Sequence, residues 1–165
     1  MRRLQRSVAI AVLGTFLGFG PALADRAPRL VAQAQAAQCV LTEILATSEK
    51  KGIDGKLDRF KGKLSKPPFT SWDSFTQLGE QSVTLERNKS APAKLETGAL
   101  SLLYKDKLVV QGGKARLRLG VDLDGKDGKR VVSTVMVFDS GDHVLIAGEP
   151  HKNGTYILAL SCTAQ

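Results

Sequence analysis

The sequence predicts an α+β domain, with two short N-terminal helices packed on an antiparallel β-sandwich or partial barrel of six to seven strands. Apolar residues recur at helical spacing in residues 39–64, whereas the period becomes two from Phe75 onward. Short clusters of Gly, Asp, Asn and Pro separate the later apolar runs. Short strands joined by such turns are typical of antiparallel sheets.

The helical pair is predicted first. The segment 39–52 has apolar residues at the spacing of one helical face, namely Val40, Leu41, Ile44 and Leu45, and Gly52 is its expected end. In the next segment Asp54 is the expected N-cap. The face of this second helix is formed by Leu57, Phe60 and Leu64, and Pro67 and Pro68 end it.

The strand regions follow in chain order. They are expected at 74–86, 91–98, 99–111, 114–124, 130–138, 143–148 and 155–162. The clearest alternation is in 114–124, where every second residue is apolar and the residues between them are mostly charged. The Asp-Gly at 127–128 predicts a hairpin turn.

The termini predict export. Residues 1–24 read as a signal peptide: three arginines, an apolar run at 7–20 and an Ala-x-Ala site ending at Ala24. Residues 25–38 are expected to form a flexible lead-in, and residues 39–165 a single domain. We expect no transmembrane segment after cleavage, and a periplasmic or secreted location in a Gram-negative-type bacterium.

The two cysteines, Cys39 and Cys162, stand at the two ends of the predicted domain. In an exported protein such a pair is expected to form a disulfide. That bond would tie the first predicted helix to the last strand.

The positive charge is local. Without the signal peptide 21 basic and 16 acidic residues remain, a net charge of +5, and residues 50–66 alone carry +5. This concentration argues against a nucleic-acid-binding surface. It suits binding to an anionic envelope component or an acidic protein, through a surface that includes Lys56, Arg59, Lys63, Phe69 and Trp72. The simpler and favoured interpretation of the segment is a packed helix whose lysines form a solvated face.

The stretch KPPFTSWDSF (66–75) holds three of the seven aromatic residues outside the signal peptide, Phe69, Trp72 and Phe75. It lies between the helical pair and the sheet. The rings form either a plug that seals this joint or a platform that binds a ligand. Of the three, Trp72 is the ring expected to be partly exposed.

Catalytic and metal-binding patterns are weak. His143 and His151 lack a recognisable nucleophile motif, so we expect no catalytic residues and no cofactor. The segment DLDGKDG (122–128) is similar to a calcium loop, but its third acid is displaced and position 133 is Ser instead of Glu. Asp122, Asp124 and Asp127 are therefore only a weak calcium candidate beside the simpler reading of a solvated turn.

The segments GIDGKLDRFKGKLSKPPFTSWDSFTQLGEQ (52–81) and HVLIAGEPHKNGTYILAL (143–160) carry a resemblance. The chain resembles a group of small uncharacterised exported bacterial proteins that share a GIDxxL…PPFxxWxSF joint and a closing Gly-rich hairpin. The resemblance implies an exported α+β domain and no known activity.

These observations favour a small exported, non-catalytic binding or structural module of the cell envelope. An inhibitor or immunity-type protein that occludes a foreign enzyme is the alternative, with a protruding loop at 139–142 or 149–154. A hydrolase with an unfamiliar site is the third hypothesis. It requires a histidine beside an acid and a hydroxyl group in a cleft.

Overall fold

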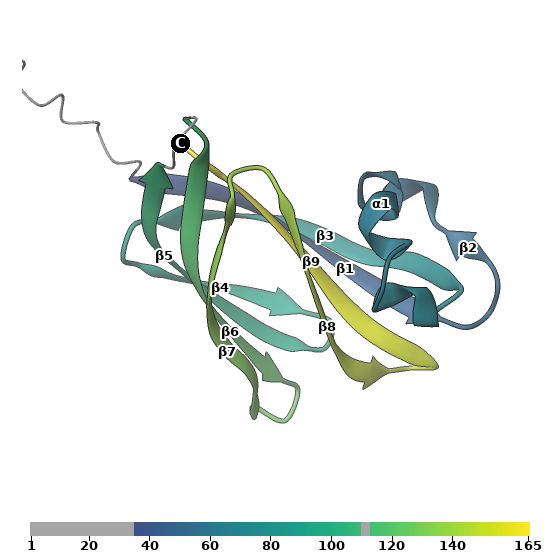
Figure 1. Cartoon of the computed structure of the whole chain (residues 1–165). Helices are drawn as coiled ribbons and strands as arrows, with labels where there is room; N and C mark the ends of the chain where they lie inside the picture. Colours follow the sequence, from purple (N-terminus) through teal and green to yellow (C-terminus); the bar gives the residue numbers. More distant parts are fainter. Residues whose placement is uncertain (1–34, 110–112) are drawn as a thin grey trace, which may run out of the picture. The chain divides into compact units, whose positions relative to one another are not determined.

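A computed structural model describes residues 35–109 and 113–165, which form two β-sheets (Figure 1). Sheet A has the order β2-β3-β1-β9-β8, with β1 (Ala36–Thr47), β2 (Gly52–Ile53), β3 (Ser74–Glu86), β8 (His143–His151) and β9 (Gly154–Ala164). Sheet B has the order β4-β5-β6-β7, with β4 (Ser90–Leu95), β5 (Gly98–Val109), β6 (Ala115–Gly125) and β7 (Arg130–Asp139). All neighbours are antiparallel except β2 and β3, which pair in parallel.

The main hydrophobic core lies between the two sheets. Sheet A contributes Leu41, Leu85, Leu158 and Leu160, and sheet B contributes Leu100, Leu102, Tyr104, Leu117 and Leu119. A single core shared by the inner faces of two sheets defines a sandwich. The sequence left a sandwich and a partial barrel open, and the two packed sheets form a sandwich.

The first predicted helix is wrong, because residues 36–47 form the strand β1. This strand lies in the middle of sheet A, between β3 and β9. Leu41 faces sheet B, whereas Ile44 and Ala46 face a second buried cluster on the opposite side of sheet A. Because both faces are covered, apolar residues occur on both, and their spacing imitates that of a helix.

The second predicted helix is confirmed in place but is shorter and mostly 3₁₀. It comprises η1 (Gly55–Phe60) and one turn of α-helix, α1 (Lys61–Leu64), followed by η2 (Phe69–Ser71). The Asp54 side chain accepts a hydrogen bond from the backbone N–H of Lys56 at 3.0 Å. The described part of the chain is thus β-rich with one short α-helix, and the α+β class with two N-terminal helices is not confirmed.

Residues 54–72, called the cap below, cover the outer face of sheet A. Leu57, Phe60 and Leu64 are almost fully buried against it. The sheet side of this second cluster is formed by Ile44, Ala46, Phe75, Ile157 and Ala159. The cap is therefore held by its own apolar face, as expected of an amphipathic segment.

The strands predicted from residue 74 onward are present among the described residues, with small shifts at their ends. Residues 110 and 111 of the strand predicted at 99–111 lie outside the described residues. In β6 the alternate residues Leu117, Leu119, Val121 and Leu123 are buried, as predicted. The turn at 125–129 is also confirmed: the N–H of Gly125 donates to the carbonyl of Lys129 at 2.9 Å, and Gly128 has φ 75°.

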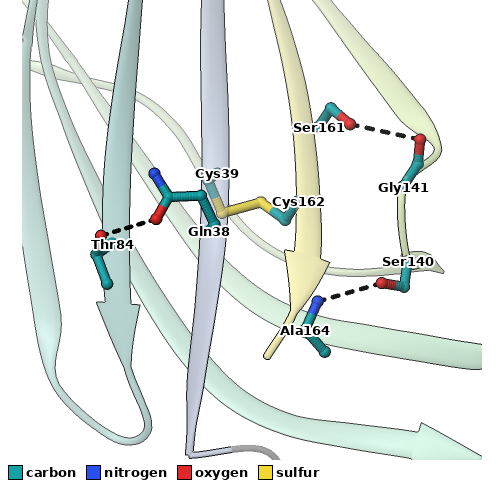
Figure 2. The surroundings of a disulfide bond; sticks show 8 residues. All are labelled: Gln38, Cys39, Thr84, Ser140, Gly141, Ser161, Cys162 and Ala164. Carbon is teal, nitrogen blue, oxygen red and sulfur yellow. Dashed lines mark hydrogen bonds between the residues drawn. A yellow bond between two sulfur atoms is a disulfide. The ribbon is translucent and has the colours of Figure 1, made fainter.

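Cys39 and Cys162 form the predicted disulfide (Figure 2). They are directly opposite each other on β1 and β9, and both are fully buried in the main core. Because residue 39 is in a strand, the bond joins two neighbouring strands and not a helix to a strand.

Residues 1–34 lie outside the described residues, and with them the predicted signal peptide and most of the lead-in. The last three residues of that lead-in, 36–38, belong to β1. In the described part of the chain we find no helix with the length and apolarity needed to span a membrane.

Candidate binding groove

A groove of about 390 Å³ runs between the cap and the edge strand β8. Its lining residues come from segments about 75 residues apart in the sequence: Lys63, Lys66, Pro67, Phe69, Asp142, His143, Val144 and Leu145. The floor is apolar and the rim carries charge. This combination suits a ligand with an apolar part and a polar or charged part.

The cap side of the groove is fixed by local structure. Phe60 and Leu64 anchor the cap on sheet A, and the chain then turns, with the N–H of Phe69 donating to the carbonyl of Lys66 at 2.9 Å. This turn places Phe69, which is 9% exposed, under the groove and leaves Lys66 and Pro67 exposed at its rim.

The strand side of the groove is a free sheet edge. The N–H of Gln165 donates to the carbonyl of Ala36, so these two residues are a hydrogen-bonded pair of the β1–β9 ladder. Because hydrogen-bonded pairs alternate with non-hydrogen-bonded pairs, every second residue of β9 directs its backbone groups away from β1. The backbone groups of Leu158 and Leu160 then point to β8 and bond Ile146 and Val144, their partners in register. The intervening residues of β8 direct their N–H and C=O groups away from the sheet.

The outward groups of His143 and Leu145 lie along the groove. At His143 they are already used: the carbonyl accepts a hydrogen bond from Lys63 Nζ, and the N–H donates to Asp142 Oδ1 at 2.7 Å. At Leu145 and Ala147 the same alternation leaves one donor and one acceptor each at the sheet edge. A ligand in the groove would therefore meet an open hydrogen-bonding edge.

The two lysines at the rim differ in whether they already have an ion-pair partner. Lys63 Nζ donates to Asp142 Oδ1 at 2.8 Å, and this bond, together with the backbone N–H of His143, lowers the pKa of Asp142. Among the ion pairs of the described residues, Lys63 takes part but the exposed Lys66 does not. Lys66 is thus the cation at the rim that is available to an anionic ligand.

His143 is held as part of the packing. Its ring meets Phe60 edge-on, with the ring centroids 4.9 Å apart. Burial lowers the pKa of His143, and the nearby cations Arg59 and Lys63 lower it further. The imidazole is therefore neutral at neutral pH and adds no positive charge to the groove.

The predicted binding surface is only partly brought together. Lys63 and Phe69 line the groove, and Trp72 packs on Phe69 with ring centroids 6.4 Å apart, partly exposed as expected. Arg59 instead bonds Thr42 at 2.8 Å and pairs with Glu80 over sheet A. Lys56 is exposed on the cap and does not line the groove.

The rings of the KPPFTSWDSF stretch mainly fill the joint. Phe75 is 3% exposed and Phe69 is 9% exposed, and both belong to the cluster between the cap and sheet A. Phe69 nevertheless also lines the groove. The plug and the binding platform are therefore not exclusive hypotheses, because the ring of Phe69 both fills the joint and lines the groove.

The weak calcium candidate is engaged internally. Arg130 pairs with Asp122 at 2.9 Å and also with Asp124, while Lys129 pairs with Asp127 at 3.1 Å. In the residues that the structure describes, no three His, Cys, Asp or Glu side chains are placed to hold a metal ion.

His151 lies near an acid, as the hydrolase hypothesis requires. Its Nε2 is 3.3 Å from Glu96 Oε1, and its ring meets Tyr156 edge-on. The same Glu96 oxygen accepts a hydrogen bond from Lys152 at 2.6 Å. His151 thus belongs to a His–Glu–Lys cluster in which its ring contacts a carboxylate and not a hydroxyl group.

A second hollow lies on the outer face of sheet B, above Gly120. Its polar side chains already bond one another: the hydroxyls of Ser90 and Ser101 are 2.6 Å apart, and Ser133 donates to Asp122 at 2.7 Å. The groove beside β8 is the stronger candidate, because it has an apolar floor and unused backbone groups.

Sequence reasoning missed the contribution of β8. Val144 and Leu145 lie in a strand that the sequence predicts, but nothing in their spacing indicates that they line a groove together with Phe69. The available signal was the basic run at 50–66, which contains two residues that line the groove, Lys63 and Lys66.

Comparisons with known proteins give no relatives: no family model, no curated protein and no solved structure matches this chain.

Proposed function

We propose that this protein is an exported, non-catalytic binding module that holds an extended peptide segment in the groove between the cap and β8. The observation that carries the proposal is the coincidence of three features in one groove. These are the outward backbone groups of Leu145, which continue at Ala147 along the same strand edge, the apolar floor at Phe69, and the exposed cation of Lys66.

An extended peptide uses all three features at once. Its backbone extends sheet A by pairing with β8, which supplies affinity regardless of sequence. Alternate side chains of the peptide point to the same side, so an apolar residue reaches Phe69 and Leu145. An acidic side chain or a C-terminal carboxylate then lies near Lys66. The ligand class is an apolar peptide strand with a negative charge near one end.

The oxidised cysteine pair supports the exported location that forms part of this proposal. Disulfides form and persist in oxidising compartments such as the periplasm and the extracellular space. The local charge of the cap, near Lys63 and Lys66, supports an acidic partner in the cell envelope.

The test uses a displayed library of random heptapeptides selected against the oxidised protein, followed by fluorescence anisotropy of each selected peptide. We expect selected peptides with alternating apolar residues and an acidic end. In ¹⁵N-labelled protein, their binding should shift the amide resonances of Leu145 and Ala147 most.

Two variants and one control sharpen the test. Lys66→Glu should weaken binding about tenfold, since the loss of one attraction and the gain of one repulsion is worth about 1.4 kcal/mol or more. Leu145→Pro removes one outward N–H without removing a bond to β9, and should also weaken binding. Lys56→Glu makes the same charge change elsewhere on the cap and should leave the Kd unchanged. Equal effects of Lys56→Glu and Lys66→Glu, or amide shifts confined to sheet B, contradict the proposal.

A further inference from the structure

The edge strand β7 lacks, between its charged end residues, the features that normally block a sheet edge. Exposed edges are normally blocked by Pro, charged side chains, short length or a covering segment. Strand β2 has two residues, β4 contains Pro92 and Lys94, and β8 contains Glu149 and Pro150 and borders the cap. In β7, by contrast, the run from Val131 to Phe138 contains no charged residue and no proline.

This strand also exposes apolar side chains. Within the residues that the structure describes, the large hydrophobic side chains that are exposed are Val109, Val135 and Val137, at 62%, 51% and 44%. Two of these three lie on β7, two residues apart and on the same face. An exposed, uncharged edge strand rich in valine is a template for another strand.

The backbone of β7 is in the right phase to accept one. The N–H of Ser140 donates to the carbonyl of Ala115 at 2.8 Å, which makes residues 115 and 140 a hydrogen-bonded pair of the β6–β7 ladder. By alternation, Thr134, Met136 and Phe138 bond β6. The N–H and C=O groups of Ser133, Val135 and Val137 then point outward from the sheet edge.

We propose that the partner is a second copy of this chain, whose β7 pairs antiparallel with the first about a two-fold axis at Val135. The two copies of sheet B become one continuous sheet. Val135 lies opposite Val135 of the other copy, and Ser133 lies opposite Val137. All three of these positions carry outward backbone groups, as the ladder requires.

The order of side chains along β7 is complementary to a second copy of β7 that runs in the opposite direction. On the outer face of sheet B the order is Arg130, Ser133, Val135, Val137 and Asp139. This order places a cation at one end, an anion at the other, and neutral residues between them. Antiparallel self-pairing at Val135 therefore brings each Arg130 toward Asp139 of the other copy.

The bulge in β7 makes this charge match possible. The register of β6 against β7 shifts between Asp124 and Leu123, so that Arg130 pairs with Asp124 and Val132 with Leu123. Val131 is thus the extra residue, and Arg130 takes the outer-face position opposite Asp139. Within each copy Arg130 also pairs with Asp122 and Asp124, and Asp139 with Arg116, so the new contact extends networks that already exist.

This assembly is independent of the proposed peptide groove. Figure 1 shows β7 and β8 running apart from the turn at 140–142 that joins them. The groove belongs to the outer face of sheet A and the cap, whereas the assembly edge belongs to sheet B.

The experiment is sedimentation equilibrium of the oxidised protein over a hundredfold concentration range. We expect the apparent mass to rise to twice that of the monomer. Val135→Lys places two positive charges on the two-fold axis at a position that is exposed in the monomer, and should give a monomer at every concentration. Val109→Lys introduces the same charge at a more exposed valine outside β7, and should dimerise as the unmodified protein does.

Hydrogen exchange identifies the edge directly. The amides of Ser133, Val135 and Val137 should become protected as the protein concentration rises, and should stay unprotected in Val135→Lys. A monomer at all concentrations overturns the proposal. It is also overturned by a dimer that survives Val135→Lys, or by one that Val109→Lys disrupts to the same extent.

Discussion

Reducing the Cys39–Cys162 disulfide should lower the free energy of unfolding by a large share of its total. The bond joins residues 123 positions apart and so closes nearly the whole described domain into one loop. The chain-entropy relation gives roughly 5 kcal/mol for a loop of this length, at the upper end of the 2–5 kcal/mol found when native disulfides are removed. A typical domain has about 5–15 kcal/mol in all.

The native state itself should change little on reduction. Both cysteines are fully buried and lie opposite each other on neighbouring strands, so the two thiols keep the same neighbours. Figure 2 shows hydrogen bonds close to the bond, among them that of Ser140 Oγ with the N–H of Ala164 at 3.2 Å, which does not depend on the sulfur atoms. The loss should therefore arise in the unfolded chain.

The assay is urea unfolding followed by the fluorescence of Trp72, with oxidised protein and with protein reduced in denaturant and refolded under reductant. With an m-value of about 2 kcal/mol/M, a loss of about 5 kcal/mol moves the midpoint by about 2.5 M. Midpoints that coincide within about 0.3 M would refute the loop argument, since that difference corresponds to less than about 1 kcal/mol. A large shift of the urea midpoint, together with a loss of native secondary structure in the dithiol form, would instead place the effect in the folded state.

Two further predictions concern residues that sequence reasoning did not single out. Burial raises the pKa of Tyr156, and its hydrogen bond to Glu43 raises it further, so the folded protein keeps the phenol protonated and should lose stability as the pH rises above about 10, where the unfolded chain ionises. The substitution Tyr156→Phe should lower the free energy of unfolding by about 1–3 kcal/mol at pH 7, because it leaves the buried Glu43 short of a donor. It should also flatten the alkaline decline in stability measured by thermal unfolding. A Cβ on Gly154 would overlap the carbonyl oxygen of Ala46 and lie 2.8 Å from Thr47 Cγ2, so Gly154→Ala should destabilise by about 1–3 kcal/mol in urea unfolding, whereas Gly148→Ala, where a Cβ meets nothing within 4 Å, should change the midpoint little. Unchanged alkaline stability in Tyr156→Phe, or equal midpoints for the two glycine variants, would contradict these assignments.

The accuracy of the sequence predictions depends on how many faces of each segment are covered. Strand β6 has one buried face, and its strict alternation identified it with the correct inward residues. Strand β1 is covered by sheet B on one face and by the cap on the other, so its apolar residues follow no period of two. A single sequence cannot distinguish such a strand from a buried helix by period alone.

The candidate groove shows a second limit. The cap carries a local signal, because its lysines and aromatic residues stand close together in the sequence. Its opposite wall comes from β8, and contact between segments about 75 residues apart depends on strand order, which the sequence pattern does not specify. Prediction therefore located Lys63 and Phe69 but not their neighbours Val144 and Leu145.

Both proposals depend on which edge strands of the two sheets are blocked and which are left open. An edge strand offers unpaired backbone groups, and a protein must either block them or use them. Strand β2 and Pro92 of β4 block two of the four edges in the described chain. The cap turns the β8 edge into a groove by placing Phe69 and Lys66 beside it. In the proposed function this arrangement restricts pairing to an apolar strand with an anionic end. At β7 the restriction comes from the strand itself, because its charge order matches a reversed copy and gives no attraction to one in the same direction. Under the two proposals the open edges select their partners by different means, so substitutions at Lys66 and at Val135 should affect binding and assembly separately.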